Sequence, residues 1–291
     1  MPILSIRHRT TYTYDEEVDA SVNQAHLRPR DLAGQRLLKY SLVSDPGFDT
    51  YEENEDCFGN PTAFFLLPKA HKTFTLTSTS RVDVSWSEAD GPPPSPPWEE
   101  VVRMAWASAG DEAREALQFA LESPMVRPFA GLKDYATRSF PPGRPLGEAA
   151  FDLTRRIHRE FRFRPGSTNP STALETVFQN RGGVCQDFSH LMIGCLRSLG
   201  LPARYVSGYL ETLPPPGKPK LMGTDASHAW VSVYIPGGGW VDFDPTNKML
   251  PGPRHVTVAW GRDFSDVSPL RGVLYGGGSQ RLKVEVDVTP D

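Results

Sequence analysis

The chain has 291 residues, 38% of them hydrophobic, which is enough for two domains of ordinary size, each with an apolar core. Its formal net charge is −4 and it has no dense cluster of lysine and arginine, so we predict no nucleic-acid or membrane partner. We expect no secretory signal, because no basic, then apolar, segment opens the chain. The cysteines, Cys57, Cys185 and Cys195, are too few for a disulfide framework, which favours the reducing cytoplasm.

Residues 1–90 are predicted to form a β-rich domain. Segments rich in β-branched and aromatic residues with polar alternation occur at 3–14, 37–43, 62–67 and 73–84. Turn-forming residues separate them, so an antiparallel sheet or sandwich is expected. The acidic run 52–56 lacks the alternating ligands and the glycine of a calcium loop, and we interpret it as a solvent-exposed turn.

A proline-rich segment, 91–97, interrupts the composition and predicts a domain boundary. Helices are expected after it at 98–107, 111–122 and within 128–138, and they end at the prolines of 141–145. The resulting division is a β-rich domain at 1–90, a proline-rich linker with helices at 91–145, and a core at 146–291.

The predicted core consists of helices followed by strands. An amphipathic helix is expected over 146–161, a short helix that opens with a capping box at 172–175, and a third helix over 184–199. Strands follow at 203–210, 228–235, 240–244, 256–260 and 282–288, with loops at 214–219, 236–239 and 276–278. This order predicts an α+β fold in which helices pack on an antiparallel sheet.

Cys185 is the candidate nucleophile. Apolar residues recur every three or four positions along 184–199, Gly182 and Gly183 provide a flexible approach, and Gly200 ends the helix. Cys185 is therefore placed in the first turn, where free N–H groups and the helix dipole favour a thiolate. Cys195, on the apolar face of the same helix, is interpreted as a core residue.

His228 and Asp244 are the candidate base and its partner. A cysteine nucleophile needs a base, and the base needs a group that orients it. If the strands at 228–235 and 240–244 form a hairpin, His228 at the start of one lies beside Asp244 at the end of the other. Asp242 competes for this role, and only the residues that follow Asp244 favour the latter. His190 lies about 140° around the helix from Cys185 and is interpreted as structural.

Blocks in the second half of the chain carry a family resemblance. They are Gly182-Gly-Val-Cys-Gln-Asp-Phe-Ser-His, Gly200-Leu-Pro-Ala-Arg-Tyr-Val-Ser-Gly-Tyr, His228-Ala-Trp-Val and Gly239-Trp-Val-Asp-Phe-Asp-Pro-Thr-Asn. In this order they resemble the bacterial transglutaminase-like family, whose members are often labelled as cysteine proteases. The first 85 residues are similar to the β-rich domain that precedes the core in this family. The resemblance implies a papain-like, transglutaminase-like core and a triad of Cys185, His228 and Asp244.

The implied reaction is attack of the Cys185 thiolate on a carboxamide or peptide carbonyl, with His228 protonating the departing amine and a thioester remaining. The backbone N–H of Cys185 is expected to stabilise the oxyanion, together with a second donor such as Gln186 or an upstream aromatic residue. Trp230 and Tyr209 are predicted to line the substrate cleft.

The sequence leaves several functions open. The leading hypothesis is transfer of an acyl group from a glutamine-type carboxamide to an amine, and the alternative is a cysteine peptidase or amidase with the same triad. A peptide-binding module without chemistry is a third possibility. The substrate is expected to be a peptide or protein, and the oligomeric state is open. Animal transglutaminases need calcium, but no acidic cluster here has calcium-ligand spacing and no Cys-x-x-Cys or His-x-x-x-His motif exists, so we predict no metal or other cofactor.

Overall fold

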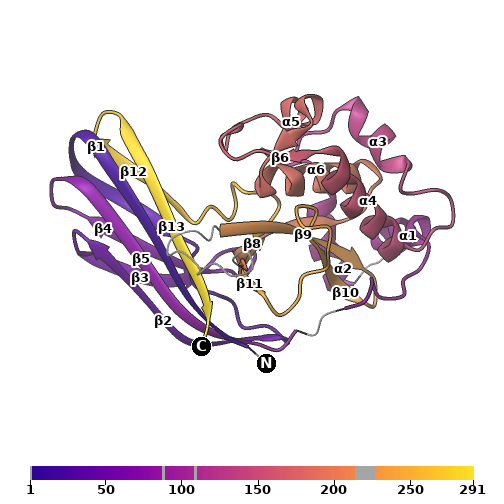
Figure 1. Ribbon diagram of the computed structural model, residues 1–291, viewed down its shortest axis with the longest axis horizontal. Coiled ribbons are helices and arrows are strands. Elements are labelled where there is room, and N and C mark those ends of the chain that lie inside the picture. Colours follow the sequence, from indigo (N-terminus) through magenta and orange to yellow (C-terminus); the bar gives the residue numbers. More distant parts are fainter. Residues whose placement is uncertain (1, 87–88, 108–109, 214–226) are drawn as a thin grey trace.

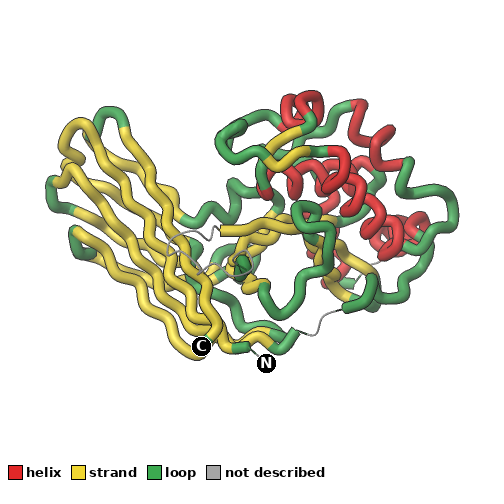
Figure 2. Tube along the Cα trace, in the orientation of Figure 1, coloured by secondary structure: helices red, strands yellow, loops and turns green. Residues whose placement is uncertain are grey.

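The computed structural model describes residues 2–86, 89–107, 110–213 and 227–291. It contains a long, twisted antiparallel sheet beside a part in which helices pack on a second antiparallel sheet (Figures 1 and 2). The predicted α+β class is thus confirmed. No helix among the described residues is long and apolar enough to cross a membrane.

The first sheet is built around one strand, β1, which is 23 residues long. The early part of β1 pairs with β5 and β13, and its later part pairs with β4 and β12. β2 and β3 lie outside β5 and β4, which gives the order β2-β5-β1-β4-β3. The strands of this sheet are β1 (Ile3–Ala25), β2 (Gln35–Asp45), β3 (Thr50–Glu55), β4 (Pro61–Leu67), β5 (His71–Val84), β12 (Leu270–Gly276) and β13 (Gln280–Pro290).

The last strands return to this N-terminal sheet, which the sequence did not predict. The strand expected at 282–288 was assigned to the core, but β13 pairs with β1, with Leu282 opposite Tyr12 and Val286 opposite His8. Alternation along a strand tells which side chains share a face, but it does not identify the neighbouring strand. The run 52–56 was also predicted incorrectly as a turn, because most of it forms the solvent-exposed strand β3.

The second sheet has the order β10-β9-β8-β11, and its neighbours are antiparallel. The longest helices are α4 and α6, and α6 packs against β9 and β8. The elements of this part are α1 (Trp98–Ala107), α2 (Asp111–Leu117), the 3₁₀ turn η1 (Gln118–Ala120), α3 (Ala130–Thr137), α4 (Leu146–Glu160), β6 (Arg162–Phe163), α5 (Leu174–Asn180), β7 (Gly182–Gly183), α6 (Cys185–Ser198), β8 (Ala203–Leu210), β9 (Ser227–Ile235), β10 (Gly239–Phe243) and β11 (His255–Gly261).

Most helix positions agree with the sequence prediction, but two local details differ. The short helix begins at Leu174 with Ala173 as its N-cap, so the predicted capping box is absent, and the Thr172 hydroxyl instead accepts the N–H of Asn169. Gly182 and Gly183 are held in β7, paired with β6. The predicted loop at 214–219 lies outside the described residues.

The two parts share one apolar core. A continuous buried cluster contains Leu4, Ile6, Val84 and Val286 from the N-terminal sheet together with Tyr209 and Val256 from the second sheet. The N-terminal sheet therefore packs directly on the part that carries Cys185. The three-part division of the chain stays a prediction.

Gly208 permits the close approach of β8 and β11. A Cβ atom at this position would lie 2.1 Å from the Val256 carbonyl oxygen and 2.5 Å from the Trp230 ring. The register of β8 and β11 also shifts beside it, between Thr257 and Ala259. Glycine is typical where two backbones come this close.

We predict that Gly208→Ala lowers the free energy of unfolding by about 1–3 kcal/mol, the usual cost of overpacking. The control is Gly91→Ala, because a Cβ atom at Gly91 would have no neighbour within 4 Å. Urea denaturation of both variants and the native chain measures the difference. Equal stability of the two variants would contradict this account of the strand contact.

Candidate active site

The start of α6 is fixed by a buried carboxylate. Asp187 Oδ2 accepts the backbone N–H of Val184 at 2.8 Å and the hydroxyl of Thr168 at 2.7 Å. A Cβ atom at Gly183 would lie 2.5 Å from the same oxygen, so close packing rather than flexibility accounts for this glycine. Burial raises the pKa of Asp187. As predicted, Cys185 is the first residue of the helix, and its side chain is half-buried.

The hairpin of β9 and β10 brings His228 and Asp244 together. Phe243 pairs with Val231, so the start of β9 lies beside the residue that follows β10. His228 Nε2 donates to Asp244 Oδ2 at 2.8 Å. The competing residue, Asp242, instead accepts the indole N–H of Trp230 at 2.9 Å. Strand register thus separates the two carboxylates, which the sequence distinguished only through the residues that follow Asp244.

Asp244 is fully buried, and both of its carboxylate oxygens accept hydrogen bonds. Its Oδ1 accepts the backbone N–H groups of Thr246 and Asn247, at 2.9 and 3.1 Å. Its Oδ2 also accepts the Asn247 side-chain amide at 2.7 Å and His255 Nε2 at 3.3 Å. Gly252 donates its N–H to His255 Nδ1 at 3.3 Å, which places the His255 proton on Nε2, facing Asp244. These contacts fix the orientation of the carboxylate.

The opposite charges of His228 and Asp244 stabilise each other. Burial opposes a charge on His228, but the Asp244 carboxylate and a hydrogen bond with the Cys185 side chain raise the pKa of His228 to about 10. Burial also opposes a charge on Asp244, yet His228 and His255 hold the pKa of Asp244 well below its usual range. Because Nε2 is engaged by Asp244, Nδ1 is the ring nitrogen left for the thiol of Cys185. At neutral pH His228 is therefore an imidazolium, held between the Cys185 side chain and the Asp244 carboxylate.

Cys185 and His228 lie on the wall of a cavity of about 530 Å³. Both parts of the molecule form this cavity: Gln186, Tyr205, Ser207 and Phe264 come from the second part, and His8, Thr10, Tyr12, Leu282 and Val284 come from β1 and β13. Most of the wall is apolar or aromatic. Burial lowers the pKa of His8 to about 4, so this second histidine is neutral there. The N-terminal sheet is thus one wall of the candidate active site, a role that the sequence did not reveal.

The remaining predicted site residues divide into two groups. Gln186 lines the cavity, and its side-chain amide donates to the Pro170 carbonyl at 3.2 Å. Trp230 and Tyr209 are not among the lining residues, which corrects the prediction. Trp230 is fully buried with its indole on Asp242, and the Tyr209 hydroxyl lies 3.0 Å from His8 Nδ1. The sequence positions of Trp230, close to His228, and of Tyr209, on the cavity-lining strand β8, did not show that both rings are buried behind the cavity wall.

Two residues were interpreted as structural, and their environments agree. Cys195 is fully buried in α6, and burial raises the pKa of its thiol far above the usual range. His190 Nε2 accepts the backbone N–H of Phe264 at 3.1 Å, and burial lowers the pKa of His190 to about 4. Neither side chain lines the cavity that contains Cys185.

His255 and Asn247 are the site residues that sequence reasoning missed. Asn247 belongs to the Asp-Pro-Thr-Asn block that carries the family resemblance, so its proximity to Asp244 could have been suspected. His255 begins β11, and only the pairing of β11 with β8 brings it to Asp244. No local motif marks it.

Among the described residues, His228, Asp244 and His255 are one group whose ligand atoms could surround a metal ion, since these atoms lie within 4.8 Å of one another. Asp244 Oδ2, however, already accepts N–H groups from both histidines and from Asn247. These hydrogen bonds account for the cluster. We therefore interpret it as a hydrogen-bond network and not as a metal centre.

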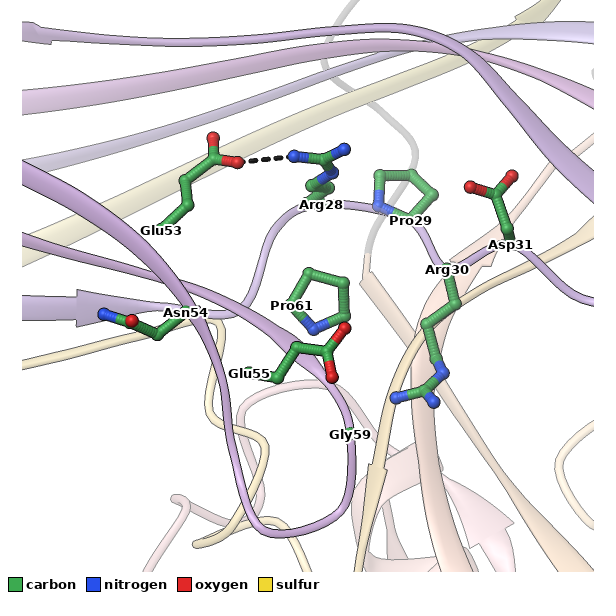
Figure 3. Close-up of a pocket in the computed structure, with 9 residues that line it drawn as sticks. All are labelled: Arg28, Pro29, Arg30, Asp31, Glu53, Asn54, Glu55, Gly59 and Pro61. Atoms are coloured by element: carbon green, nitrogen blue, oxygen red, sulfur yellow. Dashed lines mark hydrogen bonds and ion pairs between the residues drawn. The ribbon is translucent and has the colours of Figure 1, made fainter.

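A separate polar hollow of about 420 Å³ lies between the chain that follows β1 and the end of β3 (Figure 3). Arg28 Nη1 and Glu53 Oε2 form an ion pair across it at 2.5 Å. No cysteine or histidine lines this hollow, and it offers no arrangement for acyl chemistry.

Comparisons with known proteins identify the family of the chain. Residues 133–245 match the transglutaminase-like superfamily model, and residues 4–83 match the bacterial transglutaminase-like N-terminal region. An uncharacterized protein of Mycobacterium tuberculosis is 41% identical over 298 residues, with 98% of this chain and 92% of that protein covered. A protein-glutamine gamma-glutamyltransferase of Pseudomonas aeruginosa is 34% identical over 110 residues, which is 37% of this chain and 16% of that protein.

A solved structure has the same fold. The crystal structure of a "Putative Cysteine Protease" from Cytophaga hutchinsonii superposes with a TM-score of 0.77 at 24% identity, and the match covers 99% of this chain and 90% of that one. The chain therefore belongs to the transglutaminase-like superfamily, with the bacterial transglutaminase-like N-terminal region ahead of its core.

Proposed function

We propose that this protein is a cysteine-dependent acyltransferase that acts on the glutamine side chains of peptides or proteins. Cys185 is the nucleophile and His228 is the acid and base. Asp244 orients His228 and stabilises its protonated form. The observation that carries the proposal is the position of His228, which contacts the Cys185 side chain, donates to buried Asp244 and lies on the wall of a cavity.

The proposed reaction has two halves. The Cys185 thiolate adds to the carboxamide carbon, the C–N bond breaks, and the His228 proton goes to the departing nitrogen as ammonia leaves. His228 then takes a proton from an incoming amine, which attacks the thioester and releases the thiolate. The backbone N–H of Cys185, at the start of α6, supports the negative oxygen in both halves.

Hydrolysis is the alternative outcome of the same thioester. A peptidase or amidase would use the same three residues, with water in place of the amine. The apolar character of the cavity wall favours transfer, because an organic amine binds against apolar side chains more readily than water does. The gamma-glutamyltransferase name of the Pseudomonas relative also supports transfer.

The first prediction concerns the nucleophile. Cys185→Ala removes the attacking thiolate, and we expect activity to fall on the order of 10⁴-fold or more. Cys57→Ala is the matched control, because Cys57 is exposed and does not line the cavity. Intact mass after incubation with a glutamine peptide should show an acyl adduct on the native and Cys57→Ala chains but none on Cys185→Ala. An adduct on Cys185→Ala would place the nucleophile elsewhere.

The second prediction separates transfer from hydrolysis. A glutamine peptide incubated with the native chain and a primary amine should gain the mass of the amine less ammonia, because the amine resolves the thioester. If deamidated or cleaved peptide is the only product at saturating amine, the hydrolase alternative replaces the transferase. No product and no adduct with any glutamine or plain peptide would instead favour a binding module.

The third prediction concerns pH. The imidazolium of His228 is the proton donor and its pKa is raised to about 10, so kcat/KM should persist through neutral pH and fall as pH approaches about 10. Asp244→Asn removes the negative charge that raises this pKa. We expect the falling limb to move to lower pH, with a rate loss of up to about 10⁴-fold. A falling limb at the same pH in the native and Asp244→Asn chains would show that Asp244 does not raise the pKa of His228.

A further inference from the structure

A second cavity, of about 400 Å³, lies across the second sheet from Cys185. On β8, Tyr205 and Ser207 line the first cavity, whereas Arg204 and Val206 line the second. Successive side chains of a strand point to opposite faces, so the two cavities lie on opposite sides of this strand. The second cavity is closed by the chain after β1 and after β5, including Leu32 and Trp86. It is not part of the site proposed above.

Arg204 is a cation of this cavity whose side chain has no hydrogen-bond acceptor among the described residues. Its guanidinium carbon lies 4.2 Å from the ring centre of Trp240 and 3.8 Å from that of Trp260. Among the described residues its side chain has no hydrogen bond and no ion pair, and its Nε is buried. Burial lowers the pKa of Arg204 to about 9, although the nearby Asp242 raises it. A buried N–H group normally has an acceptor, because leaving it unpaired is costly.

The surroundings of Arg204 define what this partner would be. Trp86, Trp230, Trp240 and Trp260 all line the cavity, so its body is apolar and aromatic. Asp242 already accepts the Trp230 indole N–H at 2.9 Å. The wall thus holds one carboxylate, Asp242, whereas the N–H groups of the Arg204 guanidinium have no acceptor among the described residues, so the cavity lacks an acceptor for this cation.

We propose that this cavity binds a carboxylate attached to an apolar body, with the carboxylate on Arg204 and the apolar body against the tryptophans. Carboxylates match the planar donor pattern of arginine, and a volume of about 400 Å³ lies within the usual range of small-molecule pockets. The ligand would also contact His255, which lines the cavity and donates to Asp244. A bound ligand would thus contact His255, which donates to Asp244, the residue that orients His228.

The test measures binding to the full chain and does not require activity. The tryptophans of the cavity report occupancy through their fluorescence, and decanoate is the probe, with decanol as its uncharged counterpart. We expect saturable quenching by decanoate, and Arg204→Met should weaken it at least tenfold while leaving any decanol response unchanged. The matched control is Arg155→Met, since Arg155 also stacks on an aromatic ring, with its guanidinium 4.2 Å from the centre of Phe151, but lies on α4.

Three results would overturn the proposal: no saturable response of the native chain to decanoate, equal affinity for decanol and decanoate, or an Arg204→Met chain that binds decanoate as the native chain does. Thermal unfolding of each variant establishes that it is folded before titration. A second comparison uses acetyl-Leu-Phe with a free carboxyl end and with an amidated one. Tighter Arg204-dependent binding of the peptide acid would assign the cavity to peptide carboxyl ends, and tighter binding of decanoate would assign it to free organic acids.

Discussion

The hydrogen bond between His228 and Asp244 is the interaction on which the candidate active site depends. At 2.8 Å, with the carboxylate fully buried, it positions the ring and supplies the charge that keeps the ring protonated. The cost of burying Asp244 is offset by N–H groups from Thr246, Asn247 and His255. The loop that follows β10 is therefore as much a part of the site as the residues that line the cavity.

The N-terminal sheet forms the part of the cavity wall that lies opposite the second sheet and α6. Thr10 and Tyr12 of β1 and Leu282 and Val284 of β13 face Cys185 across the cavity, and the two sheets share a buried cluster. A cysteine in the first turn of a helix is open to solvent unless other elements surround it. Here a β-sheet provides the opposing wall, so the relative position of the two sheets limits which substrates reach the thiol.

Local pattern predicted the helices, the strands of the core and the hairpin that brings His228 to Asp244, because each depends on residues close in sequence. It favoured Asp244 over Asp242 only through the residues that follow Asp244, since both lie at the same end of one strand and register is what distinguishes their contacts. It missed His255 and the wall formed by β1 and β13, which depend on pairing between distant segments. It also misplaced Trp230 and Tyr209, because an aromatic residue suits a cleft and a core equally well.

The return of β12 and β13 to β1 has a topological consequence. Leu4 pairs with Pro290, so the chain starts and finishes on adjacent strands of one sheet, at the lower edge in Figure 1. The helices and the second sheet are in effect an insertion between β5 and β12: the chain leaves the N-terminal sheet beside Ile3, at the start of β1, and returns to it beside Ala25, at the end of β1. A loop joining the present ends would span only neighbouring strands, and new ends could then be opened at an exposed turn without disturbing the hairpin that holds the imidazole.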